Sequence, residues 1–162
     1  MMSRFAVAAA VAAGAGPAGA ACPVELAVYG EAQSGAEVNF TPNSGNALVT
    51  NGFRMLLDNN VVLDGIVMWT EAPERPAGML MHECPEGDVT GEELARCTVW
   101  QGVIYTSDAA GRIGLLPAEG QPAPDTLIFA DLGPSLRHSS AYGAGGFATI
   151  PFDVFALKGC QE

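Results

Sequence analysis

The chain has 162 residues, 49% of them hydrophobic, and a formal net charge of −11 at pH 7. This length predicts a single domain, long enough to bury a hydrophobic core without obligatory cross-links. The negative charge repels nucleic acid and anionic lipid head groups, so we expect no nucleic-acid partner.

The first twenty residues have the pattern of a secretory signal peptide. Arg4 precedes an apolar run from Phe5 to Ala13, and the small residues Ala18 and Ala20 follow a Gly/Pro break. The run is too short, and too rich in Ala and Gly, to cross a bilayer as a stable helix, which disfavours the alternative of a retained anchor. We expect residues 1–20 to be a signal peptide and residues 21–162 a single mature β-rich domain with no stable membrane span.

Composition indicates a bacterial, exported protein. Removal of residues 1–20 leaves six basic and eighteen acidic residues, a net charge of −12. One lysine against six arginines, with abundant Ala, Gly and Pro, is typical of GC-rich bacterial coding, and the destination would be the periplasm or the medium. Cys22 follows the cleavage point and raises the alternative of a lipoprotein anchor. Gly19 occupies the position where lipoprotein processing prefers a Leu-like residue, and this disfavours lipidation.

All four cysteines lie after the expected signal peptide, at positions 22, 84, 97 and 160. An even number of cysteines in an exported chain predicts two disulfides, and three pairings are possible. We favour Cys84–Cys97, which closes a short local loop, with Cys22–Cys160, which ties the two ends of the domain together. The ends of compact domains are often close in space, which favours the long pairing.

In the first half of the chain, periodicity and turn residues predict mainly strands. Val24–Tyr29 reads as a strand ended by Gly30, and Val38–Phe40 as a short strand in a turn-rich stretch. The apolar segments 53–57 and 61–69 flank an Asp-Asn-Asn turn and predict a hairpin. A helix over Thr50 to Leu57 is the alternative, since short apolar runs are ambiguous.

The second half begins with a predicted loop and contains the clearest helix signal. Two prolines predict a loop from Glu71 to Gly78, followed by a short strand at Met79–Met81. Thr90 and Glu93 have the spacing of a capping box, which predicts a helix that ends near Arg96. The remaining expected elements are a strand from Thr98 to Thr106, a hairpin partner from Arg112 to Leu116, a loop from Ala118 to Pro124, a strand from Thr126 to Ala130, a helix from Pro134 to Ala141 and a last strand from Phe152 to Leu157.

Metal and cysteine chemistry are disfavoured by spacing and by compartment. His82, Glu83, Cys84, Cys97 and His138 are ligand types for zinc, but they have no common zinc spacing. The carboxylates between positions 83 and 93 lack the alternating loop of a calcium site and indicate a solvated acidic face. If both disulfides form, no thiolate remains for nucleophilic chemistry.

Other catalytic and recognition patterns are equally weak. His138 is followed by Ser139 and Ser140, but the chain has no Gly-x-Ser-x-Gly elbow. A carboxylate pair for glycoside hydrolysis, such as Glu83 with Asp108, is an open alternative. Four aromatic residues are candidates for ligand recognition: Trp69, Trp100, Tyr105 and Tyr142. For Trp69 and Trp100, which lie in apolar segments, we expect core packing.

These observations lead to a fold class and to two functional hypotheses. The fold class is α+β and β-rich, with an antiparallel or mixed sheet, sandwich-like or partly closed, and one or two short helices. The leading hypothesis is a non-enzymatic periplasmic module that binds a protein or a small ligand and needs no cofactor. The alternative is a periplasmic enzyme or metal-binding protein with a site at His82, Glu83 and His138.

Overall fold

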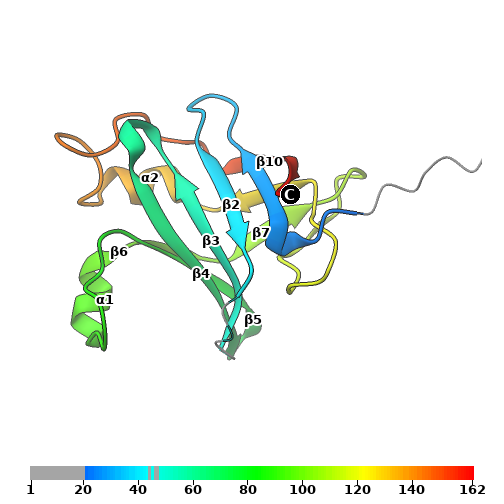
Figure 1. Ribbon diagram of the computed structural model, residues 1–162, viewed down its shortest axis with the longest axis horizontal. Coiled ribbons are helices and arrows are strands. Elements are labelled where there is room, and N and C mark those ends of the chain that lie inside the picture. The colour runs from blue at the N-terminus through cyan, green and yellow to red at the C-terminus, as the bar shows by residue number, and fades with distance from the viewer. Residues whose placement is uncertain (1–20, 44, 46–47) are drawn as a thin grey trace, which may run out of the picture.

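The computed structural model describes residues 21–43, 45 and 48–162, so the expected signal peptide lies outside the described residues. Within these ranges, ten strands form one antiparallel sheet that curls into a half-barrel, with two short α-helices (Figure 1). The expected β-rich fold with one or two short helices is confirmed. The sandwich alternative is not confirmed, because the strands belong to one curled sheet.

The sheet has two parts that differ in connectivity. The first is a meander in which each strand pairs with the next: β1 (Ala27–Gly30), β2 (Glu37–Thr41), β3 (Val49–Leu56), β4 (Val62–Glu71), β5 (Glu74–Met81) and β6 (Thr98–Gly102). The second part has the spatial order β10-β9-β7-β8 and contains β7 (Ile104–Ser107), β8 (Ile113–Leu115), β9 (Thr126–Phe129) and β10 (Val154–Cys160). Pairing of β1 with β10 joins the two parts.

The hairpin of β3 and β4 confirms the strand prediction over the helical alternative for Thr50 to Leu57. The turn between the strands is a single 3₁₀ turn, Asp58–Asn60. Asn59 and Asn60 have φ of 55° and 60°, a left-handed conformation that asparagine tolerates better than most residues. The Asp-Asn-Asn sequence therefore supplies the local geometry that reverses the chain.

The predicted loop from Glu71 to Gly78 is wrong, because β5 begins at Glu74 and continues the hairpin. Pro76 lies inside β5 and pairs with Trp69 of β4. The opposite side of β5 pairs with β6 only from Gly78 onward, so the missing amide hydrogen of Pro76 costs no ladder bond there. Trp69 lies on the same part of the β4–β5 hairpin, which extends beyond β6. Its side chain is 55% exposed, which corrects the expectation of core packing.

The predicted single strand from Thr98 to Thr106 is interrupted at Val103. β6 pairs with β5 in the first part of the sheet, whereas β7 pairs with β8 and β9 in the second. The chain therefore crosses from β6, at one end of the strand order, to β7, the next-to-last strand at the other end, between Gly102 and Ile104. The crossing brings β7 into contact with β5.

Aromatic side chains fill the interior of the curled sheet. Ring centroids lie 5.4 Å apart for Phe40 and Phe53, 5.9 Å for Phe53 and Phe129, and 5.3 Å for Trp100 and Phe129. Trp100 is buried, as expected, and its indole nitrogen donates to the Ala130 carbonyl at 2.9 Å. The Trp100–Phe129 contact is edge-to-face, a geometry that adds to the free energy of apolar burial.

One glycine makes room for this packing. A Cβ atom at Gly65 of β4 would lie 2.4 Å from the ring of Phe53 on the neighbouring strand. The absence of a side chain at this position therefore lets the Phe53 ring lie flat over β4. Any larger residue would displace a ring at the centre of the core.

Both expected disulfides are present, Cys84–Cys97 and Cys22–Cys160. Helix α1 (Gly91–Cys97) begins with the predicted capping box between Thr90 and Glu93. Figure 1 places α1 and the C-terminus at opposite sides of the molecule, so the two disulfides fasten different regions. Among the described residues, no helix has the length and apolar character required to cross a membrane.

The two ends of the chain differ from the predicted strands. The segment Val24–Leu26 forms a 3₁₀ turn, and β1 starts only at Ala27. The last strand begins at Val154, two residues later than expected, and continues to Cys160. The later start leaves Phe152 and Asp153 outside the sheet, where both contribute to a pocket.

Candidate functional site

Helix α2 (Leu132–Arg137) begins two residues before Pro134, the predicted first residue. The carboxylate of Asp153 accepts hydrogen bonds from the amides of Asp131, at 3.0 Å, and Gly133, at 3.2 Å. A side chain about twenty residues further along the chain thus satisfies amides at the start of the helix that a local cap would normally satisfy. The expectation of a helix to Ala141 is wrong, because the helix ends at Arg137.

A pocket of about 530 Å³ lies between α2 and the segment that precedes β10. Its size falls within the range of small-molecule sites. Its apolar lining includes Pro134, Ile150, Pro151 and Phe152, and Phe152 is 60% exposed. The lining residues are Gln33, Gly133, Pro134, Arg137, His138, Ile150, Pro151, Phe152 and Asp153.

A buried carboxylate holds two walls of this pocket together. Glu31 accepts hydrogen bonds from the amides of Gln33 and Ser34, at 3.0 and 2.6 Å, and from the Ser34 hydroxyl at 2.6 Å. The amide of Phe152, on the opposite wall, also stabilises it. Burial raises the pKa of Glu31, but these hydrogen bonds together outweigh burial and lower the pKa below its ordinary value. The carboxylate is therefore ionised, and its oxygens accept hydrogen bonds from the pocket wall itself.

Arg137 and His138 give the pocket its hydrogen-bond donors, and Arg137 supplies a positive charge. The His138 ring nitrogen Nδ1 lies 2.8 Å from the Pro134 carbonyl, which can only accept, so Nδ1 carries the hydrogen. The Arg137 guanidinium lies 5.5 Å from the centre of the Tyr142 ring, a cation–π contact. The described carboxylates form ion pairs with Arg54, Arg112 and Lys158, and none with Arg137. The two carboxylates beside the pocket, Glu31 and Asp153, already bind amides, so the Arg137 guanidinium and the His138 ring are the polar groups available to a ligand.

His82 and Glu83 lie in a different region, beside the Cys84–Cys97 disulfide. They line a hollow of about 300 Å³ together with Arg96 and Ser140, and they also border an adjoining hollow of about 450 Å³. The His82 amide donates to the Cys97 carbonyl at 2.9 Å, which fixes the backbone at this point. The larger of the two hollows is lined mainly by polar groups and includes the glycine-rich segment 144–146.

The structure does not place the three predicted site residues around one hollow. His138 lines the pocket beside α2, whereas His82 and Glu83 line the hollows near Ser140. The residues that the structure describes contain no group of three or more His, Cys, Asp or Glu side chains that could hold a metal ion. An enzymatic or metal-binding role for His82, Glu83 and His138 stays a prediction.

Sequence reasoning missed the most exposed wall of the pocket. The sequence predicts Phe152 in the last strand and Arg137 in the middle of a helix. The signal that could have identified them is the run Ile150-Pro151-Phe152-Asp153, in which proline and a capping carboxylate disfavour a continuous strand. Of the aromatic recognition candidates, Tyr142 packs against Phe147 at 5.4 Å and carries the Arg137 contact.

Comparison with known protein families, with curated protein sequences and with solved structures finds no match for this chain.

Proposed function

We propose that the chain is an exported, disulfide-stapled binding module whose pocket beside α2 holds a small ligand in the periplasm. The ligand has an apolar body and an anionic or hydrogen-bond-accepting group. The observation that carries the proposal is the combination, in one pocket, of the exposed Phe152 ring with Arg137 and His138. Apolar walls with a few placed polar groups are typical of small-molecule sites. The two disulfides and the signal-like N-terminus support export.

The internal hydrogen bonds of the pocket also support binding. Glu31 and Asp153 each tie an amide of one wall to a neighbouring segment, so the walls are held before any ligand arrives. A preformed site loses less conformational entropy on binding. An anionic group on the ligand would meet Arg137 without competition from a carboxylate that is still free to pair.

The test uses small aromatic carboxylates, each with its matched primary amide, titrated into protein labelled for NMR. We expect saturable shifts of the Gly133 and Phe152 amides. Phe152→Ala should weaken binding of both series, because the ring contributes apolar contact to either. Arg137→Gln should weaken binding of the carboxylates about tenfold and leave the amides unchanged, because only the carboxylates form a charge-assisted hydrogen bond.

The control is Trp69→Ala, which removes another exposed aromatic ring that does not line the pocket. This variant should bind both series like the wild type. The absence of saturable shifts in every series would overturn the proposal, as would shifts centred on His82 and Glu83. The second outcome would instead direct attention to the hollows near Ser140.

A further inference from the structure

The outer face of the second part of the sheet has a row of apolar side chains that run across four strands. Tyr105 of β7 lies opposite Leu115 of β8 on one side and Ile128 of β9 on the other. Ile128 in turn lies opposite Val154 of β10. Directly opposed residues in neighbouring strands have their Cβ atoms about 5 Å apart, so these four side chains form a continuous apolar row.

Burial confirms that this row faces away from the core. The alternate residues of the same strands are buried, among them Ile104, Leu127 and Phe155. Leu115 is 43% exposed and Val154 is 39% exposed, and Ile113, two residues before Leu115 on the same face, is 64% exposed. Single exposed apolar residues are normal on a protein surface, but an aligned set marks an interaction surface.

The row ends at an open edge of the sheet. β8 is last in the strand order, so within the described ranges it pairs only with β7, and all three of its residues are exposed. An edge strand presents unpaired amides and carbonyls to which another chain can add a strand. Here the added strand would extend the apolar row by one more residue.

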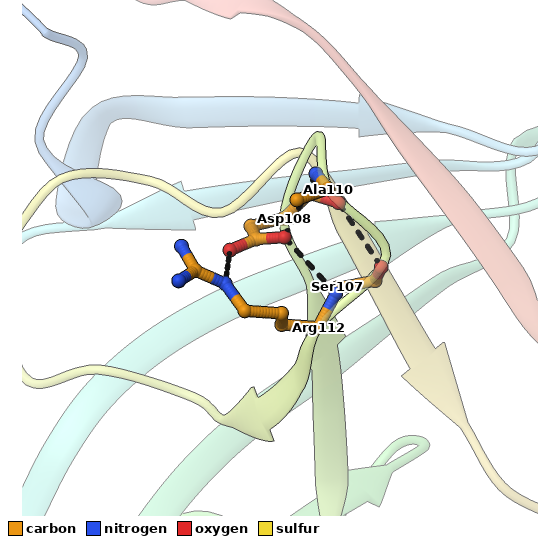
Figure 2. A network of polar contacts seen from close by, with 4 residues as sticks. All are labelled: Ser107, Asp108, Ala110 and Arg112. Carbon is orange, nitrogen blue, oxygen red and sulfur yellow. Dashed lines mark hydrogen bonds and ion pairs between the residues drawn. The ribbon is translucent and has the colours of Figure 1, made fainter.

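The turn before β8 holds this edge in place. Figure 2 shows the Asp108 carboxylate accepting from the amides of Ala110 and Arg112, at 2.9 and 3.0 Å, and from the Arg112 side chain at 2.7 Å. These bonds lower the pKa of Asp108, with the Arg112 amide as the largest cause. These bonds fix the turn that leads into β8, so a partner strand would meet a preordered edge and lose less entropy on pairing with it.

Charge decides between the possible occupants of this face. The described residues include eighteen acidic and six basic side chains, and Arg54, Arg112 and Lys158 already pair with carboxylates. A second copy of the chain would bring the same excess of negative charge. A positively charged partner would be attracted by this field instead.

We propose that an extended segment of a basic partner protein pairs with the free edge of β8 and covers the apolar row of Leu115, Tyr105, Ile128 and Val154. Main-chain hydrogen bonds to β8 supply affinity, and alternate apolar side chains of the segment continue the row. This surface is separate from the pocket beside α2, because none of these four residues lines that pocket.

The probe is a synthetic peptide of alternating valine and threonine, with two lysines at each end. Titrated into labelled full-length protein, it should shift the amides of Ile113, Gly114 and Leu115 first. Two matched peptides test its chemistry: one with glutamate in place of lysine, and one N-methylated at every valine and threonine so that neither edge can donate hydrogen bonds. Both should bind at least tenfold more weakly. Equal binding of either peptide would overturn the proposal.

Two variants connect the binding to the row. Leu115→Ser should weaken the lysine peptide about tenfold, because it removes apolar contact next to the pairing edge. Phe152→Ala, which lies in the pocket, should leave peptide binding unchanged, so failure at one surface can be distinguished from failure at the other. Sedimentation provides the remaining outcome: a dimer that dissociates in Leu115→Ser would show a second copy on this face and overturn the proposal.

Discussion

Asp58 fixes the glycine-rich loop to the turn between β3 and β4. Its carboxylate oxygens accept from the amides of Ala148 and Thr149, at 2.9 and 3.0 Å. The side-chain amide of Asn59, the next residue, donates to the Gly146 carbonyl at 3.0 Å. The hydrogen bond from the Ala148 amide is the largest cause that lowers the pKa of Asp58 below its ordinary value of 3.8. The ionised side chain is therefore better stabilised in the folded protein than in the unfolded chain.

This lowered pKa makes the contribution of Asp58 to stability depend on pH. Because the folded-state pKa is the lower one, the stabilisation is fully present above the unfolded value and is lost as the pH falls through the folded value. We expect Asp58→Asn to lower the free energy of unfolding at neutral pH, and its difference from the wild type to shrink below about pH 4. Urea denaturation of both proteins across this pH range measures the difference.

Asp64→Asn is the matched control for the pH series. Asp64 forms an ion pair with Arg54 at 3.4 Å, and both side chains are well exposed. Exposed pairs contribute little to stability, so this variant should follow the wild type at every pH. A difference between Asp58→Asn and the wild type that stays constant with pH would show that the carboxylate acts by packing and not by its charge.

At the scale of elements, α1 depends on its ends and on the surface beneath it. Seven residues form too short a helix to be stable in isolation. Thr90 accepts from the Glu93 amide at 3.3 Å, and Glu93 accepts from the Thr90 amide at 2.8 Å. Cys97, the last residue of the helix, is covalently bonded to Cys84, and Leu94 borders a small hollow with Met79 of β5.

Loss of the cap should therefore be measurable at this helix. We expect Thr90→Ala to reduce the free energy of unfolding by about 1 kcal/mol and to speed hydrogen exchange of the α1 amides, because one amide loses its acceptor. Thr90→Ser keeps a hydroxyl acceptor and should restore most of the loss. Unchanged exchange in Thr90→Ala would show that the Cys84–Cys97 disulfide alone holds the helix.

The elements that the sequence predicted correctly are those with local determinants. The capping box of Thr90 and Glu93 lies within one turn, and the turn of β3 and β4 lies in three consecutive residues. The errors at β5, at Val103 and at α2 have non-local causes. Pro76 is tolerated because β6 ends before it, Val103 breaks a strand because the two sides belong to different parts of the sheet, and α2 starts early because Asp153 caps it.

The candidate site, too, depends on contacts between distant segments that the sequence does not reveal. His82, Glu83 and His138 were selected by side-chain chemistry, which does not reveal which hollow each would line. The pocket beside α2 depends on the hydrogen bonds of Glu31, whose partners come from residues 33–34 and from Phe152. Such a wall has no signature at any single position, since only folding brings its two segments together.

At the scale of the whole molecule, one strand pairing holds the sheet together. β1 and β10, the first and last strands of the described chain, join its two parts, with Ala27 opposite Cys160. The Cys22–Cys160 disulfide lies at this junction and spans 138 positions of sequence, whereas Cys84–Cys97 spans 13. When this disulfide is formed, it restrains the pairing of β1 with β10. Closing the long loop between these two strands costs more conformational entropy than closing a short one.

This arrangement predicts unequal effects of the two disulfides. In the chain-entropy account, removing the long disulfide costs about 5 kcal/mol and removing the short one about 3 kcal/mol. We expect Cys22→Ser with Cys160→Ser to show the larger loss in urea denaturation and faster exchange of the β1 and β10 amides. Cys84→Ser with Cys97→Ser is the matched control and should speed exchange most at α1.

The location of the exchange separates this account from a general loss of stability. A purely global effect lowers the protection of every slowly exchanging amide together, because exchange then requires unfolding of the whole domain. An effect at the junction lowers the protection of β1 and β10 more than that of the β4–β5 hairpin, which lies three and four positions from β1 in the strand order. Equal loss of protection in β4 and β10 would contradict the role of the disulfide at the junction, even if the measured free energies agreed with the expectation.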